Sequence, residues 1–422
     1  MSNIKKLLEG VEVEWKTLGE IAENVSSGGT PNTGVEAFYG GNIPWLRTQE
    51  VGNGDIWSTS IKITELGLKN SSAKIIPANC IIVAMYGATV GKVGVNKIPL
   101  CTNQACANVQ INAKIANYRY VYHFLLSQYK YIKSLGAGSQ TNINLKIVKS
   151  LLIPIPCPNN PKKSLEIQQE IVRILDSFSM LTAELQAELQ ARKSQYEYYR
   201  NQLLAYPMEE SDQSSLRSNR SATSIQNSDN SIQPLSTLNP PTGNSVLQPR
   251  GKVEWKVLEE VVEIKRGKRL IKNQLEKTGK YAVYQNCMIP LGYYHKNNVI
   301  ADTTFIISAG SAGEIGYSDV DFWAADDVYY FVTKNDLKSR FLYHFLITQQ
   351  QKIYSQVRRS SVPRLSKTAF EKLLIPIPSL EEQEHIVSIL DKFDALTTSL
   401  TEGLPKEIEL RQKQYEYYRN ML

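Results

Sequence analysis

The chain has 422 residues, 42% of them hydrophobic, and a formal net charge of +7, which are ordinary values for a globular protein of two or three domains. No apolar run approaches the roughly 18 residues of a membrane span, and MSNIKKLLEG at the N-terminus has no secretory apolar run. The five cysteines form no CxxC pair, and the four histidines are scattered, so no zinc site or disulfide framework is indicated. We therefore expect a cytoplasmic protein with reduced thiols, no metal and no membrane partner.

The sequence is an internal duplication of a globular unit followed by a long helix. Four phrases of the first half return in the same order in the second half: VEVEWKTLGEIAE (11–23) as GKVEWKVLEEVVE (251–263), YRYVYHFLL (118–126) as RFLYHFLI (340–347), LLIPIP (151–156) as LLIPIP (373–378), and QYEYYRNQLL (195–204) as QYEYYRNML (414–422). The segments between these phrases have diverged.

Each globular unit is predicted to be mixed α/β. IIPANCIIVAMYG and VIADTTFIISAG, rich in Ile, Val and Ala, indicate buried strands, and the YHFLL segments indicate short amphipathic helices. LLIPIP contains too much proline for a helix interior and is predicted to be an extended edge segment that leads into the long helix.

Apolar residues at heptad spacing follow each LLIPIP phrase and predict about forty residues of helix, on the order of 60 Å. The first heptad comprises Ile167, Ile171, Ile174, Phe178, Leu181 and Leu185, and the second includes Ile386, Phe393, Leu396, Leu400, Leu404 and Ile408. Ser379 and Glu382 predict a capping box at the start of the second helix, and Gly403 with Pro405 predicts an interruption. Two such seams in one chain most simply pack together as a coiled coil.

Residues 207–250 are rich in Ser, Asn, Gln and Pro and are predicted to be a flexible linker. The predicted boundaries are therefore a globular domain at 1–160, a long helix at 161–206, the linker at 207–250, a second globular domain at 251–378 and a second long helix at 379–422. The globular domains are net basic and the helices net acidic. A polyanion would favour the former and protein partners the latter, although a solvated surface without a partner stays open.

Candidate nucleic-acid contacts lie in loops and at one strand end. In KRGKRL and RRSSVPRLS, arginines can bond bidentately to guanine or phosphate, whereas the amides of GAGSQTNINL suit adenine. IPWLRTQEV offers a tryptophan and an arginine, which would share one face of a strand, although a core tryptophan beside a surface arginine is the alternative. YGATVGKVG departs from phosphate-loop spacing and is predicted to be a glycine-rich turn. The full set is Trp45, Arg47, Lys92, Ser139, Gln140, Asn142, Lys265, Arg266, Lys268, Arg269, Arg358, Arg359 and Arg364. Ordinary surface loops are the alternative.

The repeated YEYYRN phrase offers tyrosines and an arginine, which are enriched at interface hot spots. The candidate partner-binding residues are Tyr196, Tyr198, Tyr199, Arg200, Tyr415, Tyr417, Tyr418 and Arg419. Continuation of the coiled-coil seam is the alternative, but Tyr198 faces away from Tyr196 and Tyr199 on a helix. No catalytic residues are predicted: Asp326 and Asp327 indicate a turn, and His123 and His344 indicate helix packing.

Taken together, the VEWK openings, IPWLRTQEV, the GSQTNIN and SSVPRLS loops, the LLIPIP exits, the EIV-x-ILD helices and the YEYYRN ends resemble the specificity subunit of a type I restriction-modification system. The resemblance covers essentially the whole chain. It implies two α/β target-recognition domains, related by a pseudo-twofold duplication and separated by two long antiparallel coiled-coil helices.

By the same resemblance, each domain reads one half of an interrupted sequence in double-stranded DNA, and the helices dock two adenine methyltransferase subunits. Restriction subunits join that core, so the chain sets the specificity of both methylation and cleavage. No cofactor is expected on this chain, because S-adenosylmethionine, ATP and Mg would belong to the partner subunits.

Two other hypotheses remain open on the residues alone. A free-standing enzyme acting on nucleic acid would need a cofactor or metal constellation that the sequence does not display. A coiled-coil adaptor without DNA affinity would leave the basic, divergent globular domains unexplained.

Overall fold

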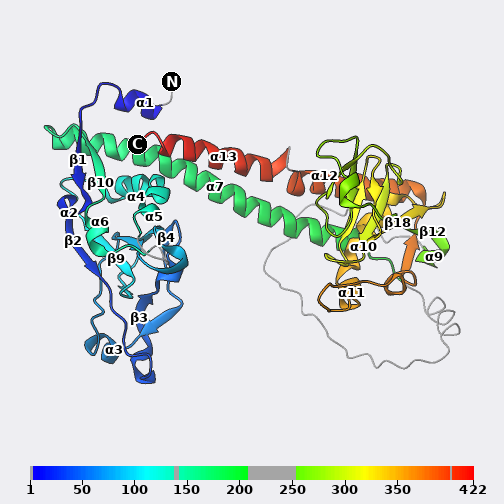
Figure 1. Cartoon of the computed structure of the whole chain (residues 1–422), viewed down its shortest axis with the longest axis horizontal. Helices are drawn as coiled ribbons and strands as arrows, with labels where there is room; N and C mark the ends of the chain where they lie inside the picture. Colours follow the sequence, from blue (N-terminus) through cyan, green and yellow to red (C-terminus); the bar gives the residue numbers. More distant parts are fainter. Residues whose placement is uncertain (1–2, 137–141, 208–252, 400–401) are drawn as a thin grey trace. The chain divides into compact units, whose positions relative to one another are not determined.

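The computed structural model describes residues 3–136, 142–207, 253–399 and 402–422 (Figure 1). The chain forms two compact units, unit 1 from residues 1–187 and 405–422 and unit 2 from residues 188–404. Each unit therefore combines the globular part of one repeat with the helical end of the other repeat.

The described strands of unit 1 form three sheets with the orders β1-β10, β2-β9-β6-β7-β4 and β5-β3-β8. The strands are β1 (Val13–Thr17), β2 (Ala22–Ser27), β3 (Tyr39–Leu46), β4 (Asp55–Ile56), β5 (Ile61–Ile63), β6 (Ile81–Ala84), β7 (Val93–Asn96), β8 (Cys101–Thr102), β9 (Cys106–Ile111) and β10 (Leu152–Pro156). The helices are α1 (Asn3–Leu8), α2 (Leu18–Ile21), α3 (Glu65–Lys69), α4 (Tyr118–Ser127), α5 (Tyr129–Ser134) and α6 (Leu145–Lys149), with short 3-10 turns η1 (Glu36–Phe38), η2 (Thr48–Glu50) and η3 (Gly87–Thr89).

Unit 2 repeats this plan in its described part, with sheets of order β11-β19, β12-β18-β15-β16 and β14-β13-β17. The strands are β11 (Glu254–Val257), β12 (Val262–Arg266), β13 (Tyr281–Tyr284), β14 (Gly292–Tyr294), β15 (Thr303–Ile307), β16 (Ile315–Ser318), β17 (Trp323–Ala324), β18 (Val328–Thr333) and β19 (Leu374–Ile377). The helices are α9 (Leu258–Val261), α10 (Ser339–Thr348), α11 (Gln350–Ser355) and α12 (Leu380–Thr398), with 3-10 turns η4 (Lys272–Gln274) and η5 (Lys367–Ala369).

The long helix α7 (Pro161–Leu203) contributes to both units, and α13 (Gly403–Arg419) carries the second YEYYRN phrase into unit 1.

Strands β6 and β15 are buried on both faces, which explains their largely apolar sequences. In β6, Ile81 and Val83 belong to one core cluster while Ile82 belongs to another. In β15, Ile306 belongs to one cluster, while Phe305 and Ile307, on either side of it in the chain, belong to a second. Successive residues of a strand point to opposite faces, so burial of both faces favours apolar residues at consecutive positions. The predicted buried strands and the predicted YHFLL helices, α4 and α10, are confirmed.

The LLIPIP phrases pair with the start of their own repeat. β10 runs antiparallel to β1 with Pro154 opposite Trp15, and β19 runs antiparallel to β11 with Pro376 opposite Trp255. A two-stranded ribbon has only edge strands, which tolerate the missing N–H of proline. The predicted extended edge segment is confirmed in both copies.

The second helix is interrupted where the sequence predicts it. α12 ends at Thr398 and α13 begins at Gly403, whose φ of +79° disfavours any other residue. A Cβ built on Gly403 would lie 2.7 Å from the backbone oxygen of Ala395. Pro405 follows in the first turn of α13, where its missing N–H has no cost. At the start of α12, Ser379 accepts from the Glu382 amide at 3.2 Å, which is half of the predicted capping box.

Helix segments from the two repeats pair antiparallel within each unit. In unit 2, Tyr206 contacts Glu382 near the start of α12. The earlier residue Tyr199 on α7 stacks on the later residue Phe393 of α12, so the two segments run in opposite directions. In unit 1, Phe178 stacks on Tyr418 with ring centroids 5.2 Å apart, and α7 and α13 lie side by side (Figure 1). The mixed α/β fold class with long antiparallel helices is confirmed.

Candidate nucleic-acid interface

In unit 2, the basic loops gather where several strands of the four-stranded sheet end or begin. Arg266 at the end of β12 pairs with Tyr329 near the start of β18, and Ile307 at the end of β15 pairs with Val328. Three segments therefore lie next to one another at this end of the sheet: the loop after β12, the turn before β18 and the loop after β15. We call this end of the sheet the unit 2 loop edge.

KRGKR covers the last two residues of β12 and the loop after it, and hydrogen bonds join it to the turn before β18. The Nε of Arg266 donates to the backbone oxygen of Asp326 at 2.7 Å, and its guanidinium lies over the Tyr329 ring, 5.7 Å from the centroid. The amide of Lys268 donates to Ala324 at 2.9 Å. A Cβ at Gly267 would come within 2.1 Å of the Ala325 oxygen, so only glycine fits between the basic residues. The glycine thus lets the basic loop approach the neighbouring turn closely.

RRSSVPRLS forms a small antiparallel bridge on the loop after β15. Arg358 and Arg364 exchange backbone hydrogen bonds of 2.9 and 3.2 Å, which brings the two arginine Cα atoms opposite each other. Buried Leu365 anchors the segment through a 2.8 Å bond from its amide to the Ser308 oxygen. The structure therefore brings the KRGKR and RRSSVPRLS predictions together at the unit 2 loop edge.

Most basic side chains at the unit 2 loop edge form no ion pair with a described carboxylate, although Asp326 and Asp327 lie in the turn before β18. Lys265 forms a 2.9 Å ion pair with Glu263. In the part of the chain that the structure describes, no carboxylate forms an ion pair with the other predicted basic residues there, which are all exposed: Arg266, Lys268, Arg269, Arg358, Arg359 and Arg364. Free guanidinium and ammonium groups on one edge create a positive field of the kind that attracts phosphates.

Unit 1 has the equivalent loop edge at the ends of β2, β9 and β6. Ser27 pairs with Ala107, and Ala84 pairs with Cys106, so the same three loops emerge together. Ile143 is bonded through its amide to the Met85 oxygen at 3.0 Å, in the same way that Leu365 is bonded to Ser308. We call this the unit 1 loop edge.

Asn142 and Arg364 hold equivalent places, each directly before the anchored residue. The Asn142 side chain accepts from the Gly87 amide at 3.4 Å, which leaves its NH₂ group available for another acceptor. Ser139 and Gln140 of the same predicted loop lie outside the described residues.

Arg47 also lies near the unit 1 loop edge, because Thr89 of the loop after β6 donates to the oxygen of the adjacent Thr48 at 2.9 Å. Its Nε donates to Glu50 at 3.3 Å, and its Nη2 donates to Ser60 at 3.2 Å. Burial of the Glu50 carboxyl raises its pKa, but hydrogen bonds from Ser60 and Arg47 outweigh burial and leave the pKa below its ordinary value. Arg47 is thus held by a carboxylate and keeps less free charge than the arginines of unit 2.

The remaining unit 1 positions are less charged. Half-buried Lys92 closes the turn after β6 by accepting the Ala84 amide at its backbone oxygen, and the predicted glycine-rich turn is confirmed as η3. Exposed Gln104, which contacts Thr30, and exposed Tyr86 belong to the same edge. Sequence reasoning missed these two, because only their position beside β9 and after β6 marks them out.

Trp45 is not available to DNA, and that prediction is wrong. Its side chain is 4% exposed, donates from Nε1 to the Gly29 oxygen at 2.9 Å, and packs with Ile63 and Cys101. The prediction assumed that strand alternation places Trp45 and Arg47 on one face. β3 ends at Leu46, however, so Arg47 already belongs to the following turn.

The YEYYRN phrases enter two matching polar clusters. In unit 1, the His123 ring bonds Asp176 at 2.8 Å and the Tyr415 hydroxyl at 2.9 Å, and Arg119 pairs with Asp176. In unit 2, His344 bonds Asp391 at 2.8 Å and Tyr196 at 3.3 Å, and Arg340 pairs with Asp391. The predicted helix-packing role of both histidines is confirmed.

Burial sets the protonation of these clusters. It lowers the pKa of His123 and His344 below the ordinary value, and the bonds to Asp176 and Asp391 offset it only in part. Burial raises the pKa of both aspartates, but bonds from the histidine and the arginine reverse the direction and leave it lowered. The imidazoles are therefore neutral and the carboxylates ionised near pH 7.

These contacts correct the predicted partner surface. Tyr196 and Tyr415 face inward to the histidines, and Tyr199 and Tyr418 stack on Phe393 and Phe178. Arg200 and Arg419 lie over the Tyr196 and Tyr415 rings at 5.2 and 5.4 Å. The chain itself therefore uses these side chains, because the helix of one repeat packs on the globular part of the other.

Among the predicted partner-binding tyrosines, Tyr198, 51% exposed, and Tyr417, 62% exposed, are the ones that point outward.

A metal-binding cluster and a membrane-spanning helix are both absent from the described ranges. No group of three or more His, Cys, Asp and Glu side chains in residues 3–136, 142–207, 253–399 and 402–422 is arranged to hold a metal ion. None of the helices in that part of the chain combines the length and the apolar character of a bilayer span.

The fold of the chain is similar to that of solved structures of type I restriction-modification proteins. The S subunit from M. genitalium superposes with a TM-score of 0.61 at 19% identity, covering 100% of this chain and 98% of that one. A chain from a structure of type I R-M complex assembly superposes with a TM-score of 0.54 at 15% identity. The match covers 97% of this chain and 96% of that one.

The chain belongs to the family described as the type I restriction modification DNA specificity domain, which it matches at residues 10–192 and again at 251–410. It is 30% identical to the specificity subunit of the type I restriction enzyme EcoR124I/EcoR124II of Escherichia coli, over 100% of this chain and 96% of that protein. It is also 30% identical to a putative type I restriction enzyme specificity subunit of Haemophilus influenzae, over 99% of this chain and 97% of that protein. The resemblance inferred from the sequence is confirmed.

Proposed function

We propose that this specificity subunit reads a two-part target in double-stranded DNA, with the unit 1 loop edge contacting one half and the unit 2 loop edge the other. The observation that carries the proposal is the pairing of equivalent loops with different chemistry. Asn142 stands where unit 2 has Arg364, and each directly precedes an anchored buried residue. An amide suits adenine and a guanidinium suits guanine or phosphate, so one frame presents two readers.

Partner docking is the second part of the proposal. Exposed Tyr198 and Tyr417 occupy equivalent positions of the two YEYYRN phrases, one in each unit. Two equivalent surfaces fit two copies of one partner, which we propose to be the adenine methyltransferase subunit. Restriction subunits would join the same complex.

The chemistry is proposed to reside on the partners. This chain would act by recognition and docking without catalytic residues of its own. S-adenosylmethionine, ATP and Mg would bind the methyltransferase and restriction subunits, and no cofactor is assigned to this chain.

The test is to purify the chain with and without its methyltransferase subunit and to measure association and methylation of DNA. We expect a complex with two methyltransferase subunits per chain that methylates adenine only at an interrupted site. Replacing Tyr198 and Tyr417 together by Ala should weaken association, with Tyr293→Ala in β14 as the control for loss of an exposed tyrosine elsewhere. DNA affinity without methyltransferase association would remove the docking role, and association without DNA affinity would favour the adaptor hypothesis.

A further inference from the structure

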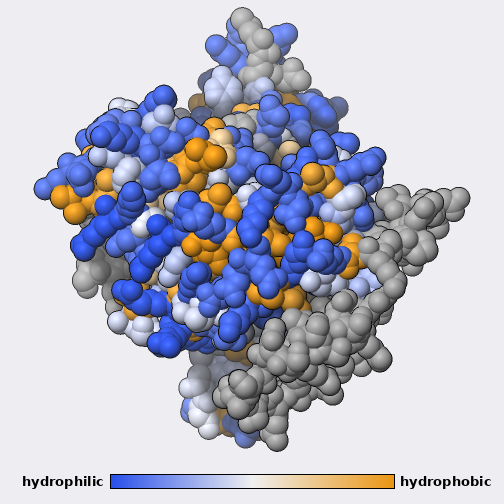
Figure 2. Space-filling model, turned by 90° about the vertical axis from the view of Figure 1, so that its right-hand side faces the viewer, coloured by the Kyte–Doolittle hydropathy of each residue, from blue (hydrophilic) through white to orange (hydrophobic). Residues whose placement is uncertain are grey.

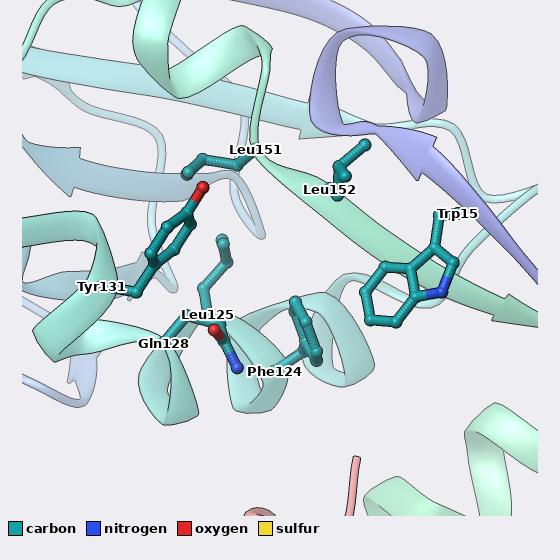
Figure 3. Close-up of a pocket in the computed structure, with 7 residues that line it drawn as sticks. All are labelled: Trp15, Phe124, Leu125, Gln128, Tyr131, Leu151 and Leu152. Atoms are coloured by element: carbon teal, nitrogen blue, oxygen red, sulfur yellow. The ribbon is translucent and has the colours of Figure 1, made fainter. Parts of the chain in front are cut away.

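Unit 1 has an apolar groove on the side of α4 that carries Phe124. The groove has a volume of about 220 Å³ (Figure 3). It is lined by Trp15, Phe124, Leu125, Gln128, Tyr131, Leu151 and Leu152. The β1–β10 ribbon supplies the indole and Leu152, and α4 and α5 supply Phe124 and Tyr131.

The groove leaves large apolar side chains in solvent. Trp15 and Tyr131 are each 55% exposed and Leu152 is 52% exposed, while Trp15 packs edge-on against Phe124 at 6.0 Å. Pockets for small-molecule ligands usually measure about 300–1,000 Å³, so this groove is better matched to one or two anchoring side chains of a protein. Aromatic side chains around a small pocket are typical of interface hot spots.

The equivalent place in unit 2 is covered by the chain itself. Trp255 corresponds to Trp15, and its Nε1 donates to the backbone oxygen of Pro207 at 3.4 Å. The preceding Leu204 and Tyr206 are buried in the unit 2 core. Trp255 is correspondingly only half-exposed, whereas no acceptor among the described residues lies within hydrogen-bond distance of the Trp15 Nε1. The same indole is therefore covered in one unit and open in the other.

The groove adjoins the proposed docking phrase. Phe124 lines the groove, and its neighbour His123 on α4 bonds Tyr415 of the second YEYYRN phrase. Exposed Tyr417 lies two residues along α13 in the same unit. A partner that contacts Tyr417 on α13 can therefore also reach the groove beside α4.

We propose that the Trp15 groove receives an extended apolar segment of the methyltransferase subunit bound at unit 1. The segment would supply what residues 206–207 supply in unit 2: a Tyr anchor beside a Pro, and a backbone carbonyl that accepts from the Trp15 indole. The proposal rests on the proposed function, because the occupant belongs to the partner named there. It also makes the two methyltransferase sites unequal, since the Trp255 site is already covered.

The occupant can be identified by crosslinking in the assembled complex. Tyr131→p-benzoylphenylalanine places a photoreactive group at the mouth of the groove in the full chain, and Lys352→p-benzoylphenylalanine places one at the equivalent position of unit 2. With purified methyltransferase subunit we expect position 131 to crosslink to a single apolar segment of one methyltransferase copy per chain, and position 352 not to crosslink to it. Equal crosslinking from both positions, crosslinking only within this chain or to a second copy of it, or no crosslinking overturns the proposal.

Matched tryptophan variants separate this inference from the proposed function. Trp15→Ala should weaken methyltransferase association at least tenfold without lowering the midpoint of thermal unfolding, because the indole is mostly in solvent. Trp255→Ala should leave association unchanged and lower the midpoint, because its indole holds residues 204–207. Undiminished association of the Trp15→Ala variant, with methylation intact, defeats the groove proposal and leaves the proposed function standing. Failure of the unmodified chain to associate with the methyltransferase defeats both.

Discussion

The loop edges of units 1 and 2 present different charges from one frame. Among the described residues, unit 2 displays exposed arginines and Lys268 without ion-paired carboxylates, whereas unit 1 displays amides and an arginine that Glu50 already holds. The strands beneath pair in the same order, β2-β9-β6-β7 in unit 1 and β12-β18-β15-β16 in unit 2. On the face that Figure 2 shows, hydrophobic residues lie among hydrophilic ones. Divergence is therefore concentrated where a ligand can be contacted, while the frame that aims the loops is kept.

Phenylalanine truncation in the helical seams should give the largest effect and show that unit 2 depends more on its seam. Phe393 stacks on both Tyr196 and Tyr199, whereas Phe178 stacks on Tyr418. Phe393→Ala should lower the free energy of unfolding by about 3 kcal/mol, near the lower end for buried phenylalanines, and Phe178→Ala should lower it by less. Urea unfolding of both variants measures the difference. Equal losses would remove the proposed inequality of the two seams.

Charge removal at equivalent loop positions should separate the two readers. Arg364→Ala should weaken specific DNA binding by about 1–3 kcal/mol if the guanidinium contacts a base, and it should lower the salt dependence if it contacts phosphate. Asn142→Ala should leave the salt dependence unchanged, because an amide neutralises no phosphate. Titrations of the complex at several salt concentrations measure both effects.

Arg173→Ala, which removes an exposed arginine paired with Glu170 on α7, is the control for a change in net charge alone. An equal loss of affinity in that variant would contradict a local role for Arg364.

Removal of single hydroxyls should test whether the two polar clusters are equivalent. Tyr196→Phe and Tyr415→Phe each delete a bond to a buried histidine, at a cost of about 1 kcal/mol of unfolding free energy. The bond of Tyr415 is the shorter, at 2.9 against 3.3 Å, so its loss should cost at least as much. Tyr198→Phe, at an exposed hydroxyl, is the control and should be neutral. A neutral result for both inward tyrosines would show that the clusters do not fix the helices.

Acidification should destabilise both clusters in the same pH range. Because the pKa of His123 and His344 is lower in the folded chain than the ordinary 6.5, the unfolded chain binds more protons as pH falls through that value. The contribution of the histidines to the unfolding free energy is therefore fully present above the ordinary pKa of 6.5. It is lost as pH falls from there through the lowered pKa of the folded chain. The aspartates add a second loss below their ordinary 3.8.

Urea midpoints at pH 7.5 and 5.5, compared with a His123→Gln and His344→Gln double variant, measure the histidine contribution. An equal fall in the double variant would assign the pH dependence to other groups.

The sequence predicted the repeated frame well, because burial on both faces and proline at ribbon edges leave direct marks in composition. It predicted the two loop edges less completely. Gln104 and Tyr86 reach their places only through strand pairing. Trp45 packs inward and donates to Gly29, and Arg47 does not share its face because β3 ends at Leu46. The roles of Tyr196 and Tyr415 also depended on which globular part each helix end packs against, and no local pattern encodes that choice.

The central claim is that this chain specifies a two-part target with one reader in each unit. The most direct test is modification-sensitive long-read sequencing of DNA from cells that express the methyltransferase subunit alone, with this chain, or with its Arg364→Ala variant. The account predicts adenine methylation at an interrupted motif only when this chain is present, and a changed preference in one half of that motif with the variant. Methylation that is independent of this chain, or equal loss at both halves with Arg364→Ala, would contradict it.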